Sequence, residues 1–144
     1  MSEPPPRPPL AVLELLGNPE LPVEPLDPRG QPWLVEADGC KAVLRRLSLS
    51  SGVEHVGWLH RFLESLARSG FPAPRPLTIL GDASVAVVDD AIWEAVSFLP
   101  GRRLNWDPRV PLGSAGALLA RFHQASMAMS VPDQRPGALP MEAC

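Results

Sequence analysis

Short apolar runs separated by turn residues fill the first two thirds of the chain and predict an antiparallel sheet. Glycine, proline, aspartate and asparagine lie between the runs, as is typical of strands joined by turns. Strands are expected at residues 23–26, 33–37, 40–47, 77–80, 84–88 and 92–99. Asp38-Gly39 is a strong hairpin signal between the second and third strands, and Gly81-Asp82 indicates a second hairpin.

The segment 53–69 has its apolar residues at helical spacing and predicts an amphipathic helix. Ser51 and Glu54 fit the capping box that starts many helices. Gly70 fits the left-handed position that ends one, and Pro72 prevents continuation. The apolar stripe of this helix consists of Val56, Leu59, Phe62, Leu63 and Leu66.

Two further helices are expected, a short one over residues 10–16 and a long one over residues 112–129. A sheet with a packed helix gives an α+β fold. The predicted organisation is a proline-rich tail at 1–9, a lobe at 10–101, a connector with a helix at 102–130, and a tail at 131–144. Within the connector, Trp106 is expected to be buried.

Composition excludes several classes of protein. Hydrophobic residues make up 45% of the 144 residues, which is not a disordered composition, and the net charge of −3 gives no nucleic-acid signal. No apolar run approaches the roughly 20 residues that cross a bilayer, and the N-terminus has no secretory pattern. Cys40 and Cys144 make no disulfide framework, so a cytoplasmic protein with free thiols is expected. Phosphate-loop, dinucleotide, zinc and serine-hydrolase motifs are absent from the sequence.

The strand at residues 40–47 contains the first candidate for chemistry, Arg45. A strand with a terminal cation, a helix, and a strand broken by Pro100-Gly101 is the order of a kinase small lobe, in which the cation pairs with nucleotide phosphates. Alternation places Val43 and Arg45 on one face of the strand. The planar fork of arginine suits phosphate; the alternative is that Arg45 and Arg46 are ordinary exposed charges.

A kinase small lobe holds that cation with a helix carboxylate, and this sequence has two candidates. Glu54 belongs to the expected capping box, and Glu64 lies away from the apolar stripe, so neither is expected to form the ion pair. His55 and His60 lie in or beside the stripe, and His123 flanks the apolar face of the last helix. All three histidines are expected to be packing residues rather than ligands.

In their order and spacing, these segments resemble the aminoglycoside phosphotransferase and choline kinase-like family, most closely its bacterial phosphotransferase enzyme branch. The similar segments are 33–39, 42–46, 63–66, 70–77, 97–102 and 118–126. The resemblance spans about residues 10–126. It implies a protein-kinase-like small lobe, its hinge, and the first helix of the large lobe.

The resemblance also implies an ATP-dependent small-molecule kinase and a set of nucleotide-binding residues. Arg45 would meet the α- and β-phosphates, and the backbones of Ser97 and Leu99 would bind adenine. Gln31 belongs to the loop expected over the phosphates, where the family often has an asparagine, and Trp33 would shape the base of that loop.

The family's catalytic loop, of H-G-D-x-x-x-x-N type, has no counterpart in the sequence, because none of the three histidines precedes Gly-Asp. The aspartate of such a loop accepts the substrate proton, and Mg²⁺ neutralises the developing charge. We therefore assign no catalytic or metal-binding residue, and expect Mg²⁺ only with a complete large lobe. The first interpretation is a truncated phosphotransferase that binds ATP weakly at most and transfers no phosphate.

Two other interpretations stay open. The chain is a non-catalytic interaction module if apolar surface on the helix at 112–129 recruits a separately encoded large lobe or promotes self-association. It is a gene remnant if the segment 137–144, which shows no family resemblance, follows a frameshift or premature stop. The acceptor substrate is not identified, because the residues that would choose it are absent from the sequence.

Overall fold

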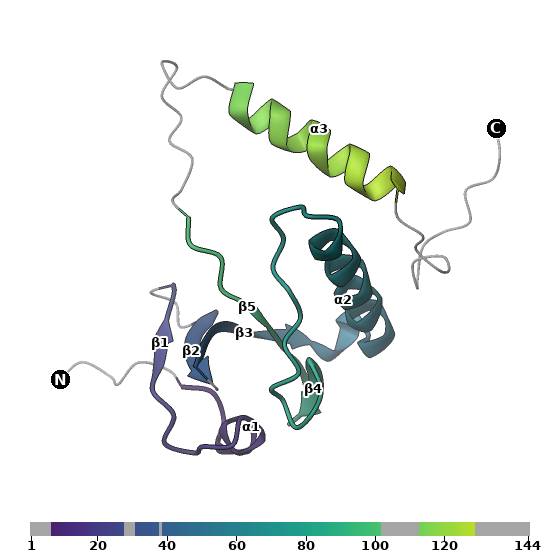
Figure 1. The fold of residues 1–144 in the computed structure, drawn as a ribbon. Helices are drawn as coiled ribbons and strands as arrows, with labels where there is room; N and C mark the ends of the chain where they lie inside the picture. Colours follow the sequence, from purple (N-terminus) through teal and green to yellow (C-terminus); the bar gives the residue numbers. More distant parts are fainter. Residues whose placement is uncertain (1–6, 28–30, 38, 102–112, 129–144) are drawn as a thin grey trace.

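The computed structural model describes residues 7–27, 31–37, 39–101 and 113–128 (Figure 1). It confirms an α+β architecture with one antiparallel sheet. In chain order the elements are α1 (Leu10–Leu15), β1 (Val23–Pro25), β2 (Trp33–Ala37), β3 (Cys40–Ser48), a 3₁₀ turn (Leu49–Ser51), α2 (Val53–Arg68), β4 (Val85–Val88), β5 (Ala91–Ser97) and α3 (Gly113–Ala128). The expectation for Trp106 lies outside the described residues, as do most of the two predicted tails.

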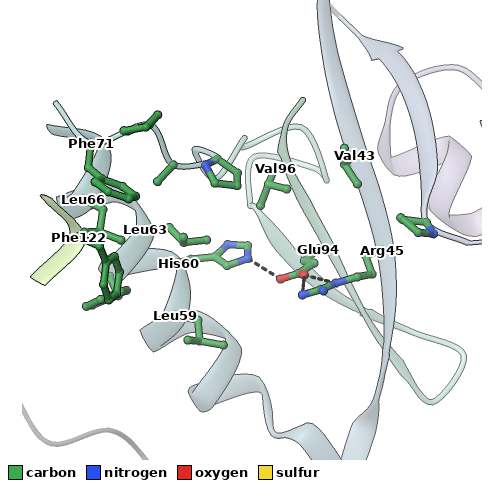
Figure 2. Close-up of a pocket in the computed structure, with 15 residues that line it drawn as sticks. Val43, Arg45, Leu59, His60, Leu63, Leu66, Phe71, Glu94, Val96 and Phe122 are labelled. Carbon is green, nitrogen blue, oxygen red and sulfur yellow. Dashed lines mark hydrogen bonds and ion pairs between the residues drawn. The ribbon is translucent and has the colours of Figure 1, made fainter. Parts of the chain in front are cut away.

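The sheet has the strand order β1-β2-β3-β5-β4, with every neighbouring pair antiparallel. Its register places Arg45 opposite Glu94 and Val43 opposite Val96, across the central pair β3 and β5. Because side chains alternate along a strand, these four residues project from one face of the sheet. That face is turned toward α2 (Figure 2).

The opposite face of the sheet carries the main hydrophobic core. Trp33 of β2 and Trp93 of β5 stack there with ring centroids 5.5 Å apart. Val12 and Leu13 of α1 pack against them. The remaining buried members are Leu21, Val35, Ala42, Leu44, Leu80, Ala91 and Ala95. The two faces therefore differ, since the core face buries mainly apolar side chains, whereas the face beside α2 carries the charged pair Arg45 and Glu94 among apolar ones.

Helix α2 lies between two glycines, Gly52 and Gly70. Gly52, with φ 81°, is its N-cap, and no side chain caps the helix, so the capping box of Ser51 and Glu54 is wrong. The backbone turn at Gly52 orients the chain in its place. At the other end, Gly70 has φ 85°. The Phe71 N–H donates to the Leu66 carbonyl over 3.2 Å, which confirms the predicted glycine-terminated end.

The predicted strand at residues 77–80 is wrong. Pro76 makes an isolated bridge to Val96, and the Leu77 N–H donates to the Ala95 carbonyl over 3.0 Å, but no strand forms over this segment. Leu80 instead turns the chain, through reciprocal backbone bonds with Ala83, and packs into the core. The hairpin that does form joins β4 to β5 through Asp89-Asp90, both at positive φ, as a two-residue hairpin turn requires.

Helix α3 lies beyond α2, at the end of the molecule opposite α1 (Figure 1). Its attachment is aromatic: the ring of Phe122 meets Phe62 of α2 at 6.3 Å and Phe71 at 5.6 Å, both edge-on. None of its described residues is fully buried. Among the residues that the structure describes, no helix has the length and apolar character to cross a membrane.

Candidate functional site

Glu94 of β5 is the centre of a buried polar network on the face of the sheet beside α2 (Figure 2). It is 5% exposed. Arg45 Nε of β3 donates to Glu94 Oε1 over 2.7 Å, and Arg45 Nη2 also contacts this oxygen. His60 Nε2 of α2 lies 2.8 Å from Glu94 Oε2. The two carboxylate oxygens therefore bind one group from the sheet and one from the helix.

His60 is bonded at both ring nitrogens. An ionised carboxylate only accepts hydrogen bonds, so Nε2 carries the hydrogen directed at Glu94. Nδ1 lies 2.7 Å from the hydroxyl of Ser84. A serine hydroxyl donates to Nδ1 when the imidazole is neutral and accepts from it when the ring is charged. The contact is therefore satisfied in either protonation state of His60.

The network keeps Glu94 ionised. Burial alone raises the pKa of a carboxyl group, but the hydrogen bond from His60 and the charge and hydrogen bond of Arg45 outweigh it. The pKa of Glu94 consequently lies below its ordinary value of 4.5. The side chain of Arg45 remains 53% exposed. Its guanidinium is thus held at one edge by a buried carboxylate and open to solvent elsewhere.

The sequence predicted that neither Glu54 nor Glu64 would pair with Arg45, and neither glutamate of α2 does. Glu64 forms an exposed pair with Arg68, its neighbour one turn along α2, at 3.3 Å. The carboxylate that sequence reasoning missed is Glu94. Its signal was present, because Glu94 is the one charge in the apolar strand β5. His60 was expected to be a packing residue; it is buried as expected, but it also donates to Glu94.

A cavity of about 490 Å³ separates α2 from the sheet at this site. Arg45, Glu94 and His60 form its polar end (Figure 2). Its remaining walls are apolar or proline side chains: Pro32, Val43, Leu59, Phe62, Leu63, Leu66, Phe71, Pro72, Ala73, Pro74, Val96 and Phe122. Apolar walls with a few convergent polar groups are typical of small-molecule sites.

The other predicted nucleotide-binding residues, which are Ser97, Leu99, Gln31 and Trp33, are not among the residues that line this cavity. Ser97 ends β5, where its N–H donates to the Arg75 carbonyl over 2.7 Å and its hydroxyl accepts from the Arg75 N–H. Leu99 follows and is 46% exposed. Gln31 is exposed and precedes Pro32, which lines the cavity. Trp33 is buried on the core face of the sheet, so its side chain packs on the side of β2 that faces away from the cavity.

No metal site is evident in the described part of the chain, where no three His, Cys, Asp or Glu side chains form a cluster that could hold an ion. Glu94 is the one carboxylate among the described residues that line the cavity, and both its oxygens are engaged. The donor set therefore does not fit a resident Mg²⁺.

Comparison with family models adds an independent finding: the model described as the phosphotransferase enzyme family matches residues 30–143. The chain belongs to this family. The match confirms the resemblance and includes every element from β2 to α3. Because it extends to residue 143, the expectation that 137–144 lies outside the family resemblance is wrong. No match was found among curated proteins.

The lowered pKa of Glu94 predicts an acid-dependent loss of stability. A folded-state pKa below the unfolded value stabilises the phosphotransferase domain above the unfolded pKa, and this contribution disappears as the pH falls through the folded pKa. The free energy of unfolding should therefore fall more steeply below about pH 4.5 in the wild type than in Glu94→Gln, by up to about 1.4 kcal/mol per pH unit. Urea unfolding at several pH values measures both slopes, and equal slopes would show that ionised Glu94 does not stabilise the fold.

Proposed function

We propose that the described residues form the nucleotide-binding part of an ATP-dependent small-molecule phosphotransferase. The observation that carries the proposal is the setting of Arg45. Its guanidinium is anchored on buried Glu94, half exposed, and placed at the polar end of an apolar cavity. An arginine held in this way keeps donors available for two phosphate oxygens at once. Membership of the phosphotransferase enzyme family supports the same conclusion.

The adenine base would lie between the apolar side chains of Val43 and Val96 and the chain after β5. Because the Ser97 N–H is already bonded to Arg75, we assign the edge of the base to the Ser97 carbonyl and the Leu99 N–H. Gln31, next to the cavity-lining Pro32, would lie over the phosphates. Trp33 would act from the core face by supporting β2 beneath that loop.

Phosphoryl transfer needs a base for the acceptor hydroxyl and Mg²⁺ for the phosphates. The residue after each of the three histidines is Val, Arg or Gln, so the sequence contains no His-Gly-Asp. We propose that these residues bind nucleotide without transferring phosphate, and that transfer would require carboxylates supplied from outside them. Mg²⁺ would then arrive with the nucleotide or with those carboxylates.

Isothermal titration with Mg-ATP tests the proposed function. We expect binding weaker than micromolar, because the cavity offers one phosphate-binding cation and one apolar slot. Submicromolar affinity or measurable phosphate turnover would contradict a binding role without catalysis. A complete absence of binding would contradict the nucleotide assignment itself.

The assignment of adenine to the Leu99 backbone predicts a difference between two substitutions. Leu99→Pro removes the N–H without a change of charge, whereas Leu99→Ala removes only the exposed side chain. Loss of one hydrogen bond should weaken Mg-ATP binding about fivefold in Leu99→Pro and have little effect in Leu99→Ala. Titration calorimetry of the two variants measures this difference, and equal affinities would exclude Leu99 as the adenine contact.

A second candidate function is self-association through α3. One observation favours it: α3 has no fully buried described residue and exposes Leu118, Leu119 and Met127, the last at 87%. Exposed apolar side chains indicate an association surface where they form a contiguous patch. Light scattering tests it directly, because a monomer over the whole accessible concentration range would exclude self-association.

A further inference from the structure

We propose that His60, oriented by Ser84, is a positioning residue that fixes the Glu94 carboxylate and, through it, the phosphate-binding guanidinium of Arg45. The inference rests on the proposed function, because it takes Arg45 as the group that meets the phosphates. It assigns to α2 an imidazole in place of the helix carboxylate that kinase small lobes use. The carboxylate itself comes from β5.

The geometry at Glu94 explains why His60 is needed. Arg45 contacts only Oε1, so Oε2 would be a buried acceptor without a partner if His60 were absent. The side chains of Glu94 and His60 are each 6% exposed, which leaves little room for water to replace the imidazole. A buried oxygen without a donor is unfavourable, so the carboxylate would rotate toward Arg45 or solvent. The guanidinium would then lose its fixed orientation.

Ser84 fixes the imidazole in turn. Its hydroxyl lies 2.7 Å from His60 Nδ1. Its carbonyl accepts from the N–H of Ala95, the residue after Glu94, over 3.0 Å. Ser84 is therefore anchored to the same strand that carries the carboxylate. With both nitrogens bonded to groups fixed on β5, the ring has one orientation, and Nε2 points at Glu94.

The position of His60 also links helix and sheet. It extends from α2 to Glu94 at the polar end of the cavity that separates the two elements (Figure 2). Its neighbours on the cavity side of α2, Leu59 and Leu63, are only partly buried. One carboxylate thus joins α2 to Arg45. Removal of the imidazole should loosen the guanidinium while leaving Arg45 itself in place.

Nuclear magnetic resonance of the full chain tests the proposal without nucleotide. The readout is the rate at which the Arg45 Nε–H exchanges with water. We expect exchange about tenfold faster in His60→Leu, because Glu94 loses its second donor and releases the arginine more often. His60→Gln should restore slow exchange, because its amide N–H can donate to Glu94. Ser84→Ala should give an intermediate rate, and His123→Gln, on α3, should match the wild type.

A second arm measures Mg-ATP affinity in the same variants. We expect His60→Leu to bind about tenfold more weakly and His60→Gln to recover most of the loss. If the wild type binds no Mg-ATP, the proposed function fails, while the exchange measurement still decides the positioning role. Unchanged exchange in folded His60→Leu overturns the inference. If His60→Leu does not fold, wild-type exchange in Ser84→Ala overturns it instead.

Discussion

Glu94→Leu is expected to unfold with a free energy about 3 kcal/mol below that of the wild type. The substitution leaves the His60 Nε2–H buried without an acceptor, and it frees Arg45 from its anchor. The expected loss is at the lower end of the range for a broken buried ion pair, because Arg45 is 53% exposed and can return to water. Urea denaturation at neutral pH measures the difference.

A triple variant separates the stability of the network from its function. Glu94→Leu combined with Arg45→Met and His60→Leu removes all three members of the network and fills the space with apolar groups, while the Ser84 hydroxyl, which loses its bond to His60, is partly exposed and can bond to water. The triple variant should return to within about 1 kcal/mol of the wild-type stability, because a buried ionic network is often replaced by apolar residues at little loss. It should not bind nucleotide. Wild-type stability in Glu94→Leu alone would show that the network does not hold this face of the sheet.

Arg45→Met is expected to weaken Mg-ATP binding about 30-fold, equivalent to roughly 2 kcal/mol for the lost charge-assisted bonds to phosphate. Methionine keeps much of the apolar stem, and Glu94 keeps its hydrogen bond from His60, so the variant should fold, with a lower free energy of unfolding because Glu94 Oε1 loses its donors. The measurement is calorimetric titration with Mg-ATP, supported by circular dichroism.

Arg46→Met is the matched control for this prediction. Arg46 is the next residue of β3 and projects from the opposite face of the sheet, opposite Trp93. The Arg46→Met substitution removes the same charge as Arg45→Met and should change the Mg-ATP affinity by no more than about twofold. Arg45→Lys, which keeps the charge but loses the planar fork, should be intermediate. Equal losses at positions 45 and 46 would mean that general positive charge, rather than the anchored guanidinium, attracts the nucleotide.

Local patterns were sufficient to predict most of the fold. Strand β2 has the predicted bounds, and Gly70 ends α2 as expected, because strand alternation and glycine at positive φ are determined by neighbouring residues. The predicted strand at residues 77–80 was wrong because the apolar side chains of this segment pack in or against the core instead of belonging to a strand of the sheet. The predicted capping box was wrong because the backbone of Gly52, and no side chain, forms the start of α2.

The site was only half predictable, for a physical reason. Arg45 could be found because a cation directly after the apolar run Ala42-Val43-Leu44 is a local pattern. Its partner Glu94 lies 49 residues away, and the two meet only through the register of β3 against β5. The role of His60 depends further on how α2 is rotated about its axis. Neither the pairing of Arg45 with Glu94 nor the rotation of α2 can be predicted from the residue spacing within a single segment.

The most direct test of the central claim is to follow the ¹⁵N-labelled chain by nuclear magnetic resonance while Mg-ATP is added. Binding through the proposed site predicts the largest shift changes at the Arg45 Nε–H and at the amides of Val43 and Leu99. Residues of α1, on the core face of the sheet, should change little. Shift changes confined to α1 or α3, with the Arg45 Nε–H unaffected at saturating nucleotide, would contradict the account.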